Sequence, residues 1–433
     1  MKQLLTLSIL EKLYVTILLI IFGGIVLHAP LSVGFETLWP NYDLLIKSWK
    51  EILMLVAGVI LLFILFKTKQ FKLLRDPILI TIGAYAVLHL VLLMYKPTGL
   101  ASSVAGLAID LRYVLYFSLV YIALRLYPNY RKVFIRVGIA GALIILIFAL
   151  LQVFVLPHDV LKYIGYNVNT ISPYLTVDQN NDFIRINSTL RGPNPLGAYA
   201  GMILVIIVAA VAKHKIKKEK WPLILTAILA AGGVVALWVS YSRSAMLATI
   251  VAIVIVLAMA NIKRISLKPW VIIVAVLAAL TGVYLLVNNT SFVSNVLLHE
   301  NPNGGSSINS NGDHINSLAN GFKQMINQPL GDGVGSTGSA SLFGNQPTVI
   351  ENQYLFTAHE AGWLGVAYFI GIFGLIMTNL WKLKKNWLAL GVFASGIGLA
   401  LIGLLLPVWV DDTVAIIWWG LAAIALFPTR EVI

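Results

Sequence analysis

The sequence predicts an all-α integral membrane protein with about twelve transmembrane helices, and three observations lead to this class. Of its 433 residues, 59% are hydrophobic and only 11% are charged, whereas a soluble globular domain carries about 25% charged residues. The apolar residues gather in long blocks, and a membrane-spanning helix needs about 20 such residues. Eleven tryptophans and seventeen tyrosines suit the aromatic belts at the two membrane surfaces. This composition excludes a conventional soluble enzyme and a disordered chain.

The apolar blocks give the order of the predicted spans. The first block follows a basic start and has no small-residue cleavage site, so we interpret it as a retained span rather than a removed signal peptide. Together the blocks make residues 1–433 a single polytopic domain. The twelve blocks are Leu10–Ala29, Ile52–Phe66, Pro77–Met94, Leu111–Leu126, Val133–Leu156, Pro195–Ala212, Trp221–Ser240, Ala245–Ala260, Pro269–Val287, Gln353–Leu380, Trp387–Pro407 and Thr413–Phe427.

Basic residues predict the orientation of these spans. With the N-terminus placed inside, 22 of the 31 lysines and arginines fall in inner segments, and 14 of the 18 acidic residues fall in outer segments. The positive-inside rule then places both termini in the cytoplasm. The net charge of +13 follows from this topology and gives no reason to expect a nucleic-acid partner. Because the chain has no cysteine, disulfides and thiol chemistry are excluded.

Two of the predicted outer loops are long, Pro157–Asn194 and Asn288–Asn352. Loops of this length in a compact protein are usually functional or disordered. Within the second loop, apolar residues at spacings of three and four predict an amphipathic helix over Asp313–Asn327. Pro329 and the glycine-rich run Gly331–Gly335 are expected to end that helix. The helix is expected to lie on the outer membrane surface or on the bundle.

Arginines recur where the predicted spans begin on the outer side. A cation at a helix N-terminus opposes the helix dipole, so this placement is locally unfavourable. One interpretation is that each arginine reaches lipid headgroups or pairs with an acid, Arg112 with Asp110 and Arg185 with Asp182. The other is a shared anion, because guanidinium groups and helix N-termini both bind phosphate oxygens. The four arginines are Arg112, Arg185, Arg191 and Arg243.

Other polar groups stand at the same predicted span ends. Asn194 is expected to cap the sixth span, with Pro195 in its first turn. Glu351 is either a cap residue of the tenth span or a general base beside the arginines. His359, eight residues further and about 12 Å deeper, is the competing base or a satisfied bundle residue. We interpret Asp411-Asp412 mainly as a turn and a cap for the twelfth span.

Four sequence blocks resemble the O-antigen ligase / O-antigen polymerase family of bacterial membrane glycosyltransferases. Each block alone is weak, but their order, spacing and common outer placement make the set moderately specific. The blocks are Arg185–Tyr199, Tyr241–Ala245, Asp313–Gly335, and Glu351–Leu355 with Gly362 and Gly365 following.

The resemblance implies a multi-pass protein of the bacterial plasma (inner) membrane. It implies transfer of a glycan from undecaprenyl pyrophosphate to an acceptor, with inversion and without nucleotide sugar, metal or other cofactor. It assigns Arg191 and Arg243 to the pyrophosphate, with Arg185 helping, and we group Asn194, Asn352 and Arg112 with them as substrate-binding residues. The acceptor is a lipid or glycan hydroxyl, deprotonated by Glu351 or His359.

Three functions stay open at this stage. The family's ligases often carry His at the position of Glu351, so a polymerase and a ligase with another acceptor are both compatible with this chain. Twelve-span proteins are most often transporters, and a lipid or solute transporter or flippase is the alternative from another class. Transporters place their polar sites near the bilayer midplane, whereas polar residues here gather at outer span ends. This asymmetry favours outer-surface chemistry on a lipid substrate.

Overall fold

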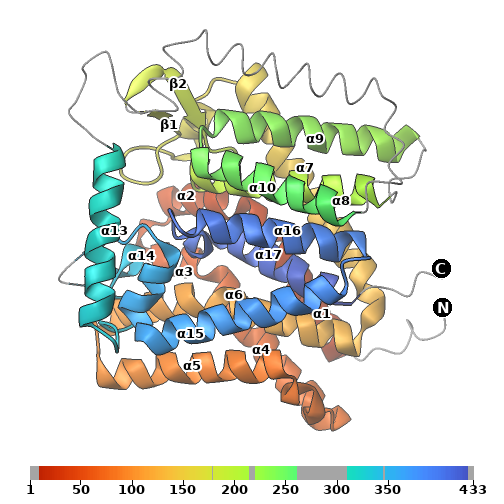
Figure 1. The fold of residues 1–433 in the computed structure, drawn as a ribbon, viewed down its shortest axis with the longest axis vertical. Helices are drawn as coiled ribbons and strands as arrows, with labels where there is room; N and C mark the ends of the chain where they lie inside the picture. Colours follow the sequence, from red (N-terminus) through yellow and green to blue (C-terminus); the bar gives the residue numbers. More distant parts are fainter. Residues whose placement is uncertain (1–8, 178, 214–219, 261–309, 345–346, 428–433) are drawn as a thin grey trace.

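The computed structural model describes residues 9–177, 179–213, 220–260, 310–344 and 347–427, and these residues are mostly helical (Figure 1). The only sheet among them is a two-stranded antiparallel hairpin in which Leu175 pairs with Arg185. The elements are α1 (Ile9–Gly24), α2 (His28–Leu38), α3 (Asp43–Lys47), α4 (Trp49–Thr68), α5 (Pro77–Tyr95), α6 (Leu100–Leu126), α7 (Arg131–Phe154), β1 (Tyr174–Val177), β2 (Asn180–Ile186), α8 (Pro193–Ala212), α9 (Lys220–Val239), α10 (Arg243–Met259), α13 (Ser310–Asn327), α14 (Gly338–Ser341), α15 (Gln353–Lys382), α16 (Trp387–Ile402) and α17 (Asp412–Ala425).

The helices confirm the predicted class of a helical, multi-pass membrane protein. Within the described residues, eight helical segments are long and apolar enough to cross a membrane, and α10, α16 and α17 are shorter apolar helices. These eleven segments correspond to eleven of the predicted blocks. The block Pro269–Val287 lies outside the described residues, so the span count of about twelve and the orientation stay predictions.

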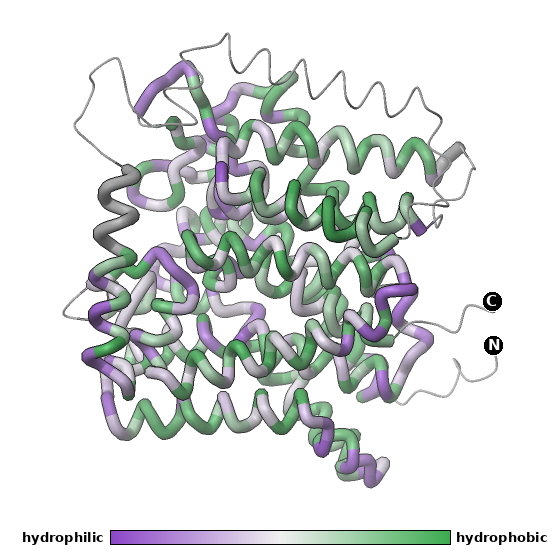
Figure 2. The backbone as a smooth tube through the Cα atoms, viewed as in Figure 1, coloured by the Kyte–Doolittle hydropathy of each residue, from purple (hydrophilic) through white to green (hydrophobic). Residues whose placement is uncertain are grey.

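Polar residues gather at the two ends of the bundle, and apolar residues fill the length between them (Figure 2). The hairpin β1–β2, α13 and α14 lie at one end, where α13 runs across the helix ends (Figure 1). The first residues of α1 and the last of α17 lie at the opposite end. We call the end with the hairpin the outer end, following the charge-based prediction.

Helix α17 lies inside the bundle rather than on its surface. Thirteen of its 14 residues are buried, including Trp418 and Trp419, which pack against each other and against Trp409. It packs against α6 and α16, while α16 packs in turn against α8 and α10. A helix that is surrounded by other helices does not have to match the thickness of the lipid bilayer. This explains why α17 can be an apolar helix of only 14 residues. Its N-terminal end, at Asp412, is held at the outer end of the protein.

Two sequence expectations about single elements are decided by the structure. The helix predicted over Asp313–Asn327 is confirmed within α13 and packs on α15, where Gly321 lies against Leu355. The prediction that Arg112 stands at a span's N-terminus is wrong, because α6 begins at Leu100. The predicted block missed these eleven residues because they include polar side chains such as Ser102 and Asp110, which are nevertheless buried inside the protein.

Candidate functional site

A cavity of about 300 Å³ opens at the outer end, between helices that are far apart in the sequence. Helices α2 and α3 form one wall, α6 another, and the cap of α17 lies between them. Both long loops contribute, the first through Asn169–Ile171 and the second through Ser339, Leu342 and Phe343. The charged or titratable groups lining the cavity are His28, Glu36, Asp43, Lys47, Lys50, Glu51, Arg112, Arg191, Asp411 and Asp412.

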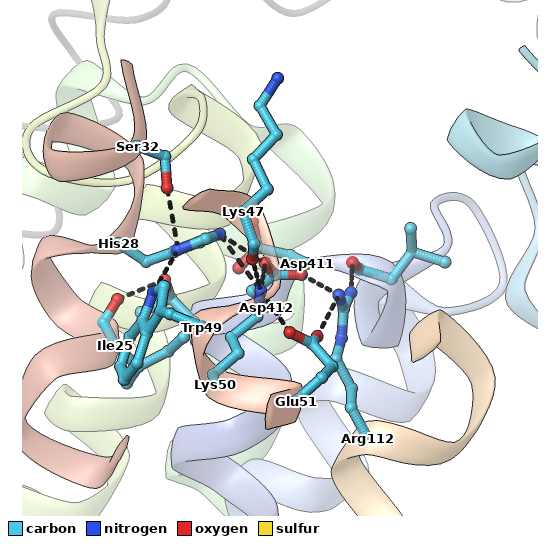
Figure 3. Close-up of polar contacts among 12 residues, drawn as sticks. Ile25, His28, Ser32, Lys47, Trp49, Lys50, Glu51, Arg112, Asp411 and Asp412 are labelled. Carbon is cyan, nitrogen blue, oxygen red and sulfur yellow. Dashed lines mark hydrogen bonds and ion pairs between the residues drawn. The ribbon is translucent and has the colours of Figure 1, made fainter. Parts of the chain in front are cut away.

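Asp412 is the centre of a buried ionic network at the base of this cavity (Figure 3). Its carboxylate accepts from Lys50 Nζ at 2.9 Å, from His28 Nε2 at 2.8 Å and from the guanidinium of Arg112. Glu51 lies 3.2 Å from Lys50 Nζ and 3.7 Å from Arg112 Nη1. Lys50 and Arg112 are 2% and 5% exposed, so each needs these carboxylates as compensation for lost hydration.

His28 is held in one tautomer by its neighbours. Its Nδ1 accepts the indole N–H of Trp49 at 3.0 Å and lies 3.1 Å from the Ser32 hydroxyl. With Nδ1 used as an acceptor, the ring proton is on Nε2, where it is donated to Asp412. Both ring nitrogens are therefore occupied, and His28 orients Asp412 rather than offering a free base.

Arg112 does not pair with Asp110, as one interpretation of the sequence expected. Its guanidinium binds Asp412, Glu51 and the carbonyl oxygen of Val410. Asp110 points away from this cluster, with its carboxylate 3.3 Å from His89 Nε2. The two neighbouring charges lie on different faces of α6, since residues two apart on a helix do not face each other. Arg112 thus lines the cavity as a neutralised cation.

Asp411 is confirmed as the cap of α17, because its Oδ1 accepts the backbone N–H of Val414 at 2.9 Å. It also lines the cavity. Burial raises the pKa of the Asp411 carboxyl above its ordinary value, and the adjacent charge of Asp412 raises it further, while Arg191 and Arg112 act in the opposite direction. A carboxyl placed in this way can take up a proton at the cavity surface.

Arg191 is exposed and lines the same cavity. Within the described part of the chain, its side chain makes no hydrogen bond and no ion pair. The turn before it is firmly anchored, because residues 186–190 are all buried and Ser188 bonds to Gln152 Oε1 and to the carbonyl of Ile145. The chain therefore presents a guanidinium from a fixed backbone, two residues before α8 begins.

Arg185 connects the first two of the blocks singled out in the sequence. Its Nε donates to the carbonyl of Ser240 at 2.8 Å, and its Nη2 donates to Asn194 Oδ1 at 2.6 Å. Asn194 is not the cap of α8, which begins at Pro193 after Gly192; its side chain serves Arg185 instead. Arg243 is confirmed at a helix start, as the first residue of α10. The outer ends of β2, α8 and α10 thus meet around Arg185.

Glu351 is not the cap of α15, because Asn352 has that role. Asn352 Oδ1 accepts the N–H groups of Tyr354 and Leu355, and its Nδ2 donates to the carbonyl of Leu404. Gln353 makes two further bonds to the turn after α16, from its N–H to Gly403 and from the Trp409 N–H to its Oε1. This corner, residues 351–353 with 403–411, joins the start of α15 to the cap of α17.

His359 is buried in α15, two turns beyond Asn352, with 5% of its surface exposed. Its carbonyl accepts the N–H of Asp332 at 2.6 Å. Its Nδ1 has no hydrogen-bond partner among the described residues. The side chain lies beneath the glycine-rich run of the second long loop, and it does not line the cavity.

The structure thus brings together some of the sequence candidates and adds others. Arg112 and Arg191 share the cavity, and Arg185 binds Asn194, whereas Arg243, Glu351, Asn352 and His359 are not part of the cavity lining described above. Sequence reasoning missed His28, Lys50 and Glu51 and gave Asp411 only a capping role. The available signal was a pair of charges, Lys50-Glu51, directly before an apolar block.

A family comparison supports the resemblance over part of the chain. Residues 225–378, about a third of the chain, match the family model described as O-antigen ligase. This stretch of the chain is therefore similar to the O-antigen ligase family. The matched range includes Arg243, Glu351 and His359, and the match supports a role in surface polysaccharide biosynthesis. A search of curated proteins finds no match.

Proposed function

We propose that this protein transfers a glycan from undecaprenyl pyrophosphate to an acceptor hydroxyl on the outer face of the bacterial plasma membrane, with inversion and without nucleotide sugar. The observation that carries the proposal is Arg191, whose guanidinium lines a cavity at the outer end and makes no hydrogen bond or ion pair among the described residues. The match to the O-antigen ligase family supports the class of reaction. Lipid-linked donors present their diphosphate at the membrane surface, which is the depth of this cavity in the proposed orientation.

In the proposed reaction, the acceptor oxygen attacks the anomeric carbon of the donor sugar as its proton passes to a carboxylate. The bond from the anomeric carbon to phosphate breaks, and its electron pair stays on the diphosphate oxygen. Arg191 and the positive N-terminal end of the α8 dipole stabilise that charge. Arg243 and Arg185, at the adjoining ends of α10 and β2, add positive potential.

Three groups are candidates for the proton acceptor. Asp411 has the strongest geometric support, because it lines the cavity, interacts with Arg191 and has a raised pKa. Glu351 has the support of the family resemblance and stands at the other side of the same corner. His359 lies under the second long loop and is the weakest of the three. We therefore assign Asp411 as the base, with Glu351 as the alternative.

The test is turnover by the full-length protein reconstituted in vesicles with a lipid-linked oligosaccharide. Transfer to an acceptor, release of undecaprenyl pyrophosphate and no use of nucleotide sugar would support the proposal. A ligase transfers to a lipid or glycan acceptor of another kind, whereas a polymerase uses a second lipid-linked glycan as acceptor. Movement of the intact donor between leaflets without glycan transfer would instead establish a flippase.

A further inference from the structure

Glu360 is a buried carboxyl in α15 that the proposed reaction does not use. Only 1% of its surface is exposed, and it lies within an apolar helix. A carboxylate in such a place is costly unless its oxygens are satisfied. Its position therefore calls for specific partners, and the second long loop supplies them.

Both oxygens of Glu360 accept backbone N–H groups from that loop. Oε2 accepts from Gly335 at 2.9 Å, and Oε1 accepts from Thr337 at 3.2 Å. These bonds join residues 23 and 25 positions apart in the sequence. One side chain thus fixes two points of a segment that has no regular structure of its own.

The segment fits closely between α6 and α15. A side chain at Gly335 would collide with the carbonyl of Ser102 in α6, and Gly106 lies against the Gly335 backbone. Gly331 approaches the kink of α15 at Gly362, where φ is 66°. The glycines let the loop backbone reach the carboxyl, and Glu360 then holds it there.

The held segment leads directly into a wall of the cavity. Helix α14 begins at Gly338, whose N–H bonds to the carbonyl of Thr348 at 2.8 Å, as does the Thr337 hydroxyl at 3.0 Å. Ser339, Leu342 and Phe343, in and just after α14, line the cavity. The position of this wall relative to Arg191 therefore depends on where residues 335–337 are fixed.

We propose that Glu360 is a positioning residue that sets the α14 wall of the substrate cavity. The inference rests on the proposed function for its kinetic consequence, but its structural part is independent of any reaction. Since Glu360 acts on the wall rather than on the reacting atoms, its loss is expected to weaken donor binding more than the chemical step.

The test compares Glu360→Ala and Glu360→Gln with Thr357→Val, a matched control on the same buried stretch. Among the described residues, the Thr357 hydroxyl bonds to the Gln353 carbonyl of its own helix, so this control removes a buried polar bond other than those to the loop. We expect amide hydrogen exchange over 335–343 to rise about tenfold in Glu360→Ala, as for lost hydrogen bonds. Glu360→Gln, which keeps one acceptor oxygen, should be intermediate.

The kinetic arm uses the lipid-linked oligosaccharide and, as a separate binding probe, undecaprenyl pyrophosphate alone. KM for the donor should rise about tenfold in Glu360→Ala, with a smaller change in kcat and no change in Thr357→Val. Unchanged exchange over 335–343, or equal effects in the control, would overturn the positioning role. If the wild type shows no turnover, the proposed function fails, while the exchange and binding measurements still decide the role of Glu360.

Discussion

Arg112 and Arg191 line one cavity, yet their surroundings are opposite. Arg112 is 5% exposed and bound by two carboxylates and a carbonyl, whereas Arg191 is exposed and makes no hydrogen bond or ion pair among the described residues. Charges that are paired inside the protein connect helices to one another. Because the opposite charges largely cancel, such a pair attracts a charged ligand only weakly. The comparison teaches that lining the cavity does not by itself favour a ligand-binding role for an arginine; a guanidinium without an internal hydrogen bond or ion pair among the described residues is the better candidate.

The largest effect is expected from removing Arg112, whose charge is compensated inside the protein. Arg112→Ala removes one of the two buried cations that compensate Glu51 and Asp412 and leaves Lys50 to serve both, so the free energy of unfolding should fall by about 3–5 kcal/mol. Thermal unfolding in detergent, followed by near-UV circular dichroism, measures this loss. A variant with unchanged stability and selectively lost turnover would place Arg112 on the ligand-binding side instead.

Removing the Arg191 guanidinium should lower turnover and leave the stability of the protein unchanged. Arg191→Ala is expected to lower kcat on a lipid-linked glycan by about 10²–10³-fold, about 3 kcal/mol, because one stabilising charge on the leaving diphosphate is lost. Its thermal stability should match the wild type. Arg191→Lys keeps the charge but not the bidentate geometry, so its kcat should lie between those of Arg191→Ala and the wild type. Wild-type turnover by Arg191→Ala would remove the diphosphate role.

The pH profile sharpens the comparison by testing the carboxyl beside Arg191. Only the deprotonated form of Asp411 accepts a proton, so activity should be present above its raised pKa and lost as the pH falls through it. Asp411→Asn can still cap α17, because asparagine accepts from the Val414 N–H equally well. For Asp411→Asn we expect a rate about a hundredfold lower than that of the wild type. The loss of activity at low pH, the acid limb of the profile, should disappear, and the thermal stability should be unchanged. If the limb persists in Asp411→Asn and disappears in Glu351→Gln, Glu351 is the base.

The smallest effect is expected at a cap outside the cavity lining. Asn352→Ala removes two bonds to the start of α15 and should lower the free energy of unfolding by about 1 kcal/mol. Asn352→Asp keeps the capping oxygen but loses the Nδ2 bond to the Leu404 carbonyl, so the same thermal unfolding separates the cap from that bond. A loss of turnover in Asn352→Ala without any loss of stability would point to substrate binding by the amide.

Apolar blocks predicted most of the helices because burial in lipid and in protein both select the same side chains. The block rule failed at the start of α6, where Ser102, Ser103 and Asp110 are buried against protein rather than lipid. It also gave no sign of the β1–β2 hairpin. Local sequence was enough to predict that Asp411 caps a helix, since a cap involves residues three positions apart.

The ionic network was not predictable from local patterns. His28, Lys50, Arg112 and Asp412 come from four helices, and hundreds of residues separate the first from the last. Nothing in the spacing of a single segment reveals such partners. The arginine pattern identified the outer end as the place of interest, but only the fold distinguishes the satisfied guanidinium from the unpaired one.

The corner between α15 and α17 has a consequence for how this protein tolerates change in length. Glu351 and Asp411 are 60 positions apart in the sequence, yet bonds from Asn352 and Gln353 to Leu404, Gly403 and Trp409 tie their backbones into one unit. An insertion or deletion between 403 and 409 would therefore displace both carboxyls at once. Natural variation in length should be confined to other surface connections, and a reporter tag inserted between 403 and 409 should abolish the proposed activity by moving both carboxyls.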